Sequence, residues 1–301
     1  MSVTETETHV LPGRGEQHDV VGTRVHVEWR GPASGPVTLV LHGGGPGCHA
    51  ASDFAAVLTA LPGRRFLLVD LPGYGASAPL ADPGPIFSTQ ARVLRELLDR
   101  LDLRRVDVLA QSLGGSVALK LAADHADRVG RIVLIGAQPV PAPATAGVDP
   151  ALGGRIRQEY YADPRPDAAT MRRLIADVEW WDGAAVPEEL VRARHAASVT
   201  PTALAVATDA ARRGTPEDLS GDLARVVAPT LVIWGRHDPF AGPDYALALS
   251  GALPAADLVV LSRSAHHPQA ERPQVVAALV DRHLGSRSDS PPVPFEGVPS
   301  A

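Results

Sequence analysis

A serine in a short polar segment has the surroundings of a catalytic nucleophile. Ser112 follows the apolar run Val106 to Ala110 and precedes a helical pattern, so it lies in a tight turn between a strand and a helix. Such a turn needs small residues two positions before and after the nucleophile, and Ala110 and Gly114 stand there. The turn would expose the Ser112 hydroxyl and place the Leu113 N–H at a helix N-terminus, where negative charge is favoured. The alternative is that Ser112 only caps this helix.

A serine nucleophile needs a histidine base and a carboxylate that orients the base, and candidates for both follow later apolar runs. Asp238 comes after the run Thr230 to Trp234, and His266 and His267 come after the run Leu258 to Leu261. We expect Asp238 to orient His266, with His267 as the alternative base. No metal site is expected, because these histidines lack the helical spacing of a two-histidine ligand pair.

A run of three glycines offers further backbone donors. Gly43 to Gly45 come just after the apolar run Val37 to Leu41, and glycines let backbone N–H groups approach a reacting oxygen without obstruction by side chains. We expect the N–H groups of Gly44 and Leu113 to stabilise an oxyanion. A phosphate-binding loop is the alternative, but the Gly-Lys-Ser/Thr of that motif does not follow, so no cofactor is expected.

The segments that position these residues alternate between strand and helix patterns. Continuous apolar runs are typical of parallel strands buried on both faces, so the pattern predicts a doubly wound, mostly parallel α/β sheet. The expected strands with such a run are Val37 to Leu41, Phe66 to Asp70, Val106 to Ala110, Arg131 to Ile135, Thr230 to Trp234 and Leu258 to Leu261. The segment Arg24 to Trp29 alternates instead, which indicates an antiparallel strand with an exposed face. The expected helices are Phe54 to Leu61, Ser88 to Leu101, Leu113 to Asp124, Asp244 to Leu253 and Glu271 to Leu284.

One long interval, residues 137–225, has no strand pattern. It starts with the Pro-rich segment Gln138 to Pro150 and is too long for a loop, so we interpret it as a helical lid inserted into an α/β core of residues 1–136 and 226–285. A separate helical domain without a part in catalysis is the alternative. The tail, residues 286–301, is rich in Ser and Pro and is predicted to be disordered. The expected lid helices are Gly154 to Tyr161, Ala168 to Trp180, Pro187 to Ala197, Thr202 to Arg212 and Pro216 to Val226.

Composition narrows the class of protein. Lys and Arg number 28 and Asp and Glu number 34, a formal net charge of −6, which disfavours a nucleic-acid partner. The single cysteine, Cys48, excludes intramolecular disulfides and thiolate metal cages. No apolar run approaches the ~18 residues of a membrane-spanning helix, and no signal peptide is visible. We therefore expect a cytoplasmic protein that acts on a small molecule and has no membrane partner. The sequence is compatible with a homo-oligomer.

Together these residues resemble the α/β-hydrolase superfamily and, within it, the meta-cleavage-product hydrolases. Those enzymes are serine-dependent C–C bond hydrolases of aromatic and steroid-ring degradation. The segments that carry the resemblance are His42 to Gly47 (HGGGPG), Leu68 to Ser77 (LVDLPGYGAS), Gln111 to Gly115 (QSLGG), Trp234 to Asp238 (WGRHD), Ala265 to Glu271 (AHHPQAE) and, in the lid, Asp182 to Arg194.

The resemblance implies a role for each matching residue. Ser112, Asp238 and His266 would form a catalytic triad, with Gly44 and Leu113 as the oxyanion hole. Arg194 would bind a substrate carboxylate, because a guanidinium holds a carboxylate bidentately and stays charged; the alternative is a solvated lid arginine. The other residues expected to contact substrate are Gly45, Asp53, Gln111, Trp180 and His267.

The chain departs from the family's pattern at four positions. Gln111 and Asp53 stand where the family usually has Asn, His267 stands where it usually has Trp, and Glu179, beside Trp180, stands where an aromatic residue is common. Asp53 and Glu179 would repel an anionic substrate if both faced the pocket.

Three functions are compatible with these residues. The first is hydrolysis of a C–C bond in a 2-hydroxy-6-oxo-dienoate, with the dienolate product held by Arg194. The second is hydrolysis of an ester, lactone or amide by the same triad; an oxygen leaving group needs no electron sink, so this reaction would not require Arg194. The third is a non-catalytic ligand receptor, which an intact triad argues against.

Overall fold

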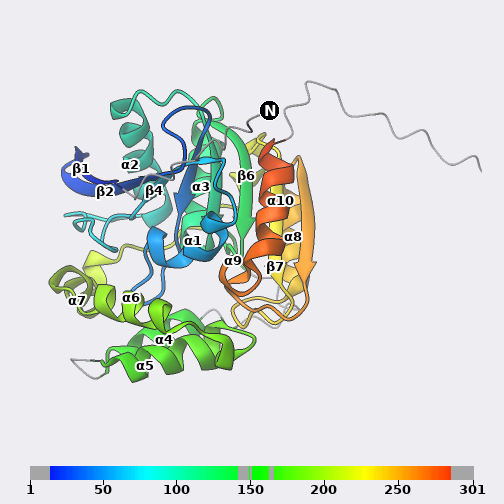
Figure 1. Ribbon diagram of the computed structural model, residues 1–301. Coiled ribbons are helices and arrows are strands. Elements are labelled where there is room, and N and C mark those ends of the chain that lie inside the picture. Colours follow the sequence, from blue (N-terminus) through cyan, green and yellow to red (C-terminus); the bar gives the residue numbers. More distant parts are fainter. Residues whose placement is uncertain (1–13, 142–148, 150, 163–165, 286–301) are drawn as a thin grey trace, which may run out of the picture.

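The computed structural model describes residues 14–141, 149, 151–162 and 166–285, and an eight-stranded sheet runs through its centre (Figure 1). The strand order is β1-β2-β4-β3-β5-β6-β7-β8. β2 is antiparallel to both of its neighbours, and β3 to β8 are all parallel, which confirms the predicted doubly wound α/β fold. The strands are β1 (Arg14–Val20), β2 (Thr23–Arg30), β3 (Val37–Leu41), β4 (Arg65–Val69), β5 (Val106–Gln111), β6 (Val129–Ile135), β7 (Thr230–Gly235) and β8 (Ala256–Leu261).

The strands face two helical layers, because successive side chains of a strand point to opposite faces. On β3, Leu39 and Leu41 join one apolar cluster, while Val40 joins the other. The first cluster includes residues of α2 (Ile86–Arg100), α3 (Ser112–Asp124) and α8 (Pro243–Ala252). The second includes residues of α1 (Ala50–Thr59) and α10 (Pro273–Gly285). Burial on both faces explains why these strands are continuous apolar runs in the sequence.

The interval between β6 and β7 is helical, as expected, and its helices gather at one end of the sheet (Figure 1). They have an apolar cluster of their own, which includes Ile156, Met171 and Trp180. The helices are α4 (Leu152–Tyr160), α5 (Ala168–Leu174) with a π-helical continuation (Ile175–Glu179), α6 (Glu188–Ser198) and α7 (Pro201–Thr208).

The prediction of a last helix in this interval, Pro216 to Val226, is wrong, because only the 3₁₀ turn Leu223–Arg225 forms there. The reason is that polar groups of this segment bond elsewhere. The Glu217 carboxylate accepts hydrogen bonds from the Phe87 and Ser88 N–H groups at the start of α2, at 2.5 and 3.1 Å. The chain that returns from the helical insertion therefore caps a helix of the core.

The first strand was not expected from the sequence. β1 is a polar strand that pairs only with β2, at the edge of the sheet, so its residues lack the apolar pattern of a buried strand. Among the described residues, the helices are all too short or too polar to cross a membrane. The predicted disordered tail, residues 286–301, lies outside the described residues, as do residues 1–13 and most of the Pro-rich segment after β6.

Candidate active site

The loops after β3, β5, β7 and β8 meet at the carboxyl ends of the parallel strands and border one cavity with the helical insertion. The cavity has a volume of about 460 Å³. Its lining includes Gly44 from the loop after β3, Ser112 and Leu113 after β5, Phe240 after β7 and His266 after β8. Cavities of this size at the strand ends of α/β sheets are common sites for small molecules.

Ser112 adopts a backbone conformation that non-glycine residues rarely take. Its φ is +49°, in the left-handed region, and it stands between the end of β5 and the start of α3. A Cβ atom at Gly114 would lie 2.6 Å from the carbonyl oxygens of Leu41 and His42, so the first turn of α3 packs directly on the end of β3. The sharp turn therefore has the geometry of a nucleophile elbow and raises Ser112 toward the cavity.

His266 is held by Asp238. The Nδ1 atom of His266 lies 2.8 Å from Asp238 Oδ2, and both residues are buried. Burial lowers the pKa of His266, but the charge and hydrogen bond of Asp238, together with the charges of Glu179 and Asp53, raise it by more, so the pKa lies above its ordinary value. Gly136, with φ +57°, makes room: a Cβ there would lie 3.2 Å from the imidazole ring. Because Nδ1 faces the carboxylate, Nε2 is the nitrogen left to act as a base.

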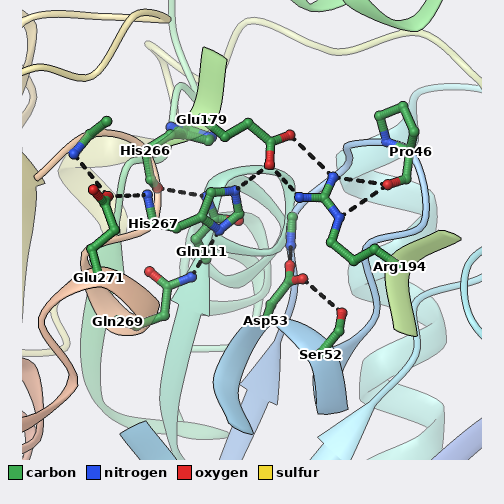
Figure 2. Close-up of polar contacts among 12 residues, drawn as sticks. Pro46, Ser52, Asp53, Gln111, Glu179, Arg194, His266, His267, Gln269 and Glu271 are labelled. Atoms are coloured by element: carbon green, nitrogen blue, oxygen red, sulfur yellow. Dashed lines mark hydrogen bonds and ion pairs between the residues drawn. The ribbon is translucent and has the colours of Figure 1, made fainter. Parts of the chain in front are cut away.

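A carboxylate that sequence reasoning did not single out holds the histidine loop. Glu271, in α9 (Pro268–Glu271), accepts hydrogen bonds from the N–H groups of Ala265, at 2.8 Å, and His267, at 3.2 Å. Its other oxygen accepts the Trp181 N–H of the insertion at 2.8 Å (Figure 2). The only signal in the sequence was its place at the end of the AHHPQAE segment.

The glycine loop is fixed by its neighbours. His42 is fully buried, accepts the Leu71 N–H at its Nε2 atom (2.9 Å) and contacts the Gly43 carbonyl through Nδ1 (2.6 Å). The Gly44 carbonyl accepts from Arg157 in α4 at 2.5 Å and from the Tyr74 hydroxyl at 3.3 Å. Arg157 was not expected at the site, and nothing distinguishes it from the other arginines of the chain in sequence.

Arg194 in α6 is buried and already paired (Figure 2). Its Nη1 atom contacts Glu179 Oε2, and its Nη2 atom lies 3.1 Å from Glu179 Oε1. Its Nε and Nη2 atoms donate to the Pro46 carbonyl at 3.2 and 2.8 Å. His267 Nε2 lies 3.3 Å from Glu179 Oε2, so the carboxylate joins the insertion to the histidine loop.

The structure separates the predicted substrate contacts into two groups. Gly45, Gln111 and His267 line the cavity, and so does Glu179. Arg194, Asp53 and Trp180 are not among its lining residues, which corrects the expectation that they contact a substrate there directly.

The physical reasons differ. Arg194 is turned to Glu179 and Pro46, as described above. Asp53 accepts the Gly43 N–H at 3.0 Å and the Ser52 hydroxyl at 3.0 Å, so it fixes the glycine loop from behind. Trp180 packs in the apolar cluster of the insertion.

Comparisons with known proteins agree with this architecture. A family model described as "alpha/beta hydrolase fold" matches residues 37–273. A 2-hydroxy-6-oxononadienedioate/2-hydroxy-6-oxononatrienedioate hydrolase of Cupriavidus pinatubonensis is 32% identical over 268 residues, which cover 87% of this chain and 91% of that protein. A 2-hydroxymuconate semialdehyde hydrolase of Pseudomonas putida is 32% identical, over 91% of this chain and 95% of that protein.

Two solved structures show how widely this fold is used. The 2-hydroxy-6-oxo-6-phenylhexa-2,4-dienoate hydrolase of a Rhodococcus strain superposes with a TM-score of 0.76 at 26% identity and covers 91% of this chain and 99% of that one. An esterase of Exiguobacterium antarcticum superposes with a TM-score of 0.75 at 24% identity, over 91% of this chain and 100% of that one. The second likeness concerns the fold alone.

We predict that Glu271→Gln lowers the free energy of unfolding by about 1–3 kcal/mol, because an amide accepts the loop N–H groups more weakly than a carboxylate. Urea denaturation monitored by circular dichroism measures the change. Asp127→Asn is the matched control, since Asp127 is exposed in the turn before β6, at the end of the parallel strands opposite to the histidine loop. Equal stabilities of Glu271→Gln and wild type would show that this carboxylate does not hold the loop.

Proposed function

Because the chain belongs to the α/β-hydrolase family, we propose that it is a serine hydrolase that cleaves a C–C bond in a small meta-cleavage product of the 2-hydroxy-6-oxo-dienoate type. The observation that carries the proposal is the pairing of buried His266 with Asp238, at 2.8 Å, beside the same cavity that Ser112 and the glycine loop line. The names of relatives at 32% identity support the choice of a C–C bond.

In the proposed reaction, His266 Nε2 takes the proton of the Ser112 hydroxyl, and Asp238 stabilises the imidazolium that forms. Ser112, or a water molecule that it activates, adds to the C6 carbonyl carbon. The N–H groups of Gly44 and Leu113 donate to the resulting oxyanion; their residues lie together, since a Cβ at Gly44 would be 3.2 Å from the Leu113 side chain. The Arg157 and Tyr74 contacts hold the Gly44 carbonyl, and with it the orientation of this loop.

The C–C bond breaks only if its electron pair has an acceptor. The dienol must therefore first ketonise, with the proton of the C2 hydroxyl group moved to C5. The C5–C6 bond then breaks, and its electrons pass through the C3–C4 double bond to the C2 oxygen. The imidazolium of His266 supplies the proton that neutralises this dienolate, and water releases the acyl group as a carboxylic acid. Every proton transfer of this reaction passes through the His266 side chain, which is consistent with the several contacts that hold its loop.

A second candidate, hydrolysis of an ester, lactone or amide, is favoured by one observation. Arg194, expected to hold the carboxylate and the dienolate of a C–C substrate, is paired with Glu179 and does not line the cavity. An oxygen or nitrogen leaving group needs only a proton from His266 and no second cation.

The first prediction of this proposal concerns the base. Ser112→Ala and His266→Ala each lower kcat by about 10⁴- to 10⁶-fold, because nucleophile and base act as one unit. His267→Ala alters chiefly KM, since His267 contacts Glu179 rather than Asp238. Steady-state kinetics on all three variants, with circular dichroism to establish folding, provides the measurement. A larger loss of kcat in His267→Ala than in His266→Ala would contradict the assignment.

The second prediction concerns pH. His266 must be neutral to act as a base, and Asp238 raises its pKa above the ordinary value of 6.5. The value of kcat/KM should therefore rise with pH and level off above an inflection that lies higher than 6.5. Asp238→Asn removes the raising charge, so its inflection moves to lower pH and kcat falls by about 10⁴-fold. An inflection unchanged by Asp238→Asn would exclude His266 as the titrating base.

The third prediction separates the two candidate reactions. A yellow dienol ketone is offered both as the free C1 carboxylate and as its primary C1 amide, beside a series of aryl esters. C–C cleavage bleaches the yellow chromophore, whereas hydrolysis of the C1 amide leaves it intact. We expect bleaching of at least one dienol ketone with kcat/KM at least about tenfold above the best ester, a difference of ~1.4 kcal/mol in barrier. Ester turnover without bleaching would select the second candidate.

A further inference from the structure

Glu179 lines the cavity, while Arg194, which the Glu179 carboxylate binds, does not. Both side chains are almost completely buried, with exposed fractions of 3% and 1%. The charge of the lid arginine is therefore presented to the cavity only through a carboxylate that belongs to the protein itself (Figure 2).

Arg194 has little capacity left for another anion. A guanidinium has five N–H donors, and four of them already make contacts: two to the Pro46 carbonyl and two to the Glu179 carboxylate. The space around it is also filled. A Cβ atom at Gly45 would lie 3.0 Å from Arg194 Nη2 and 3.2 Å from Glu179 Oε1, so the ion pair packs directly against the glycine loop. A substrate carboxylate reaches this arginine only by displacing Glu179.

Glu179 carries a full negative charge. Burial alone would raise its pKa, but the Arg194 guanidinium and His267 lower the pKa well below the ordinary value. The ion pair is therefore neutral as a whole. A second carboxylate beside it would add an anion without adding a cation, and buried like charges repel strongly.

The groups that remain in this part of the cavity accept hydrogen bonds. The two Glu179 oxygens have about four acceptor sites, of which Arg194 and His267 use three. Gln111 also lines the cavity, but its Oε1 atom is buried against Gly43, so Glu179 supplies the acceptor site that remains here. An acceptor site without a partner calls for a donor on the ligand.

We propose that Glu179 determines substrate specificity by taking the place of a substrate carboxylate on Arg194, so that the substrate brings an uncharged hydrogen-bond donor, such as a primary amide or a hydroxyl group, to this end of the cavity. The proposal rests on the proposed function only for the carbon skeleton of the substrate. It distinguishes this protein from the relative named for a dioate, whose substrate carries two carboxylates.

The test measures binding without turnover. Sorbate and its primary amide, sorbamide, have the same dienoyl skeleton and differ only in the charged group. Their Kd values are measured by titration calorimetry at pH 7.5 on Ser112→Ala protein and on the same protein with Glu179→Gln. We expect sorbamide to bind at least about tenfold more tightly than sorbate when Glu179 is present, and sorbate to bind more tightly once Glu179→Gln frees the charge of Arg194; tenfold corresponds to ~1.4 kcal/mol.

Asp177→Asn is the matched control. Asp177 is exposed on the same π-helical turn as Glu179. Its substitution removes the same charge, so it should leave the ratio of the two Kd values unchanged. A ratio that is the same with and without Glu179→Gln overturns the proposal. If Glu179→Gln does not fold, Ser112→Ala protein decides by itself, because tighter binding of sorbate than of sorbamide also overturns it.

The outcome is separate from that of the proposed function. The expected Kd ratio together with no bleaching of any dienol ketone removes the C–C reaction and keeps the role of Glu179. Bleaching together with an unchanged ratio removes the role of Glu179 and keeps the reaction.

Discussion

The left-handed backbone of Ser112 is the constraint on which the site depends. A residue with φ near +49° forces the chain to reverse sharply after β5, and α3 then starts so close to β3 that only glycine fits at position 114. The Gly114 N–H donates to the His42 carbonyl at 3.0 Å, which ties the start of α3 to the glycine loop. Ser112 and the glycine loop are thus placed by one contact between two backbones, and the buried sheet supplies the stability that holds this strained residue.

A second level of organisation rests on buried charges that join the insertion to the core. The Glu179 carbonyl accepts the His266 N–H at 3.0 Å, while its carboxylate binds Arg194 and His267. Arg194 in turn binds the Pro46 carbonyl of the glycine loop. A single residue of the insertion therefore contacts both the loop of His266 and, through Arg194, the glycine loop. Buried ions of this kind add little net stability, because desolvation offsets much of their attraction.

The sequence allowed the sheet, and the placement of Ser112, Asp238 and His266 at the carboxyl ends of its strands, to be predicted because both leave local signals. Buried parallel strands are continuous apolar runs, and Ser112, Asp238 and His266 each follow such a run. The interactions of Arg194 and Glu179 could not be predicted in this way. These residues are fifteen positions apart, on separate helical turns, and only the packing of the insertion brings them together. The capping role of Glu217 was missed for the same reason, since its partner Phe87 lies 130 positions away. The edge strand β1 was missed for another reason: it forms a local hairpin with β2, but its residues are polar and lack the apolar pattern of a buried strand.

The paired state of Arg194 also changes how the leaving group must be stabilised. A free guanidinium would hold the charge of a departing dienolate by attraction, whereas a guanidinium compensated by Glu179 has little net charge to offer. In the proposed reaction, the negative charge that leaves the tetrahedral intermediate would then be neutralised by a proton, which His266, held by Asp238, would give. This demand is the same for carbon, oxygen and nitrogen leaving groups. The proposed C–C and ester reactions would therefore use the same residues of this cavity. They would differ mainly in the acidity of the leaving group.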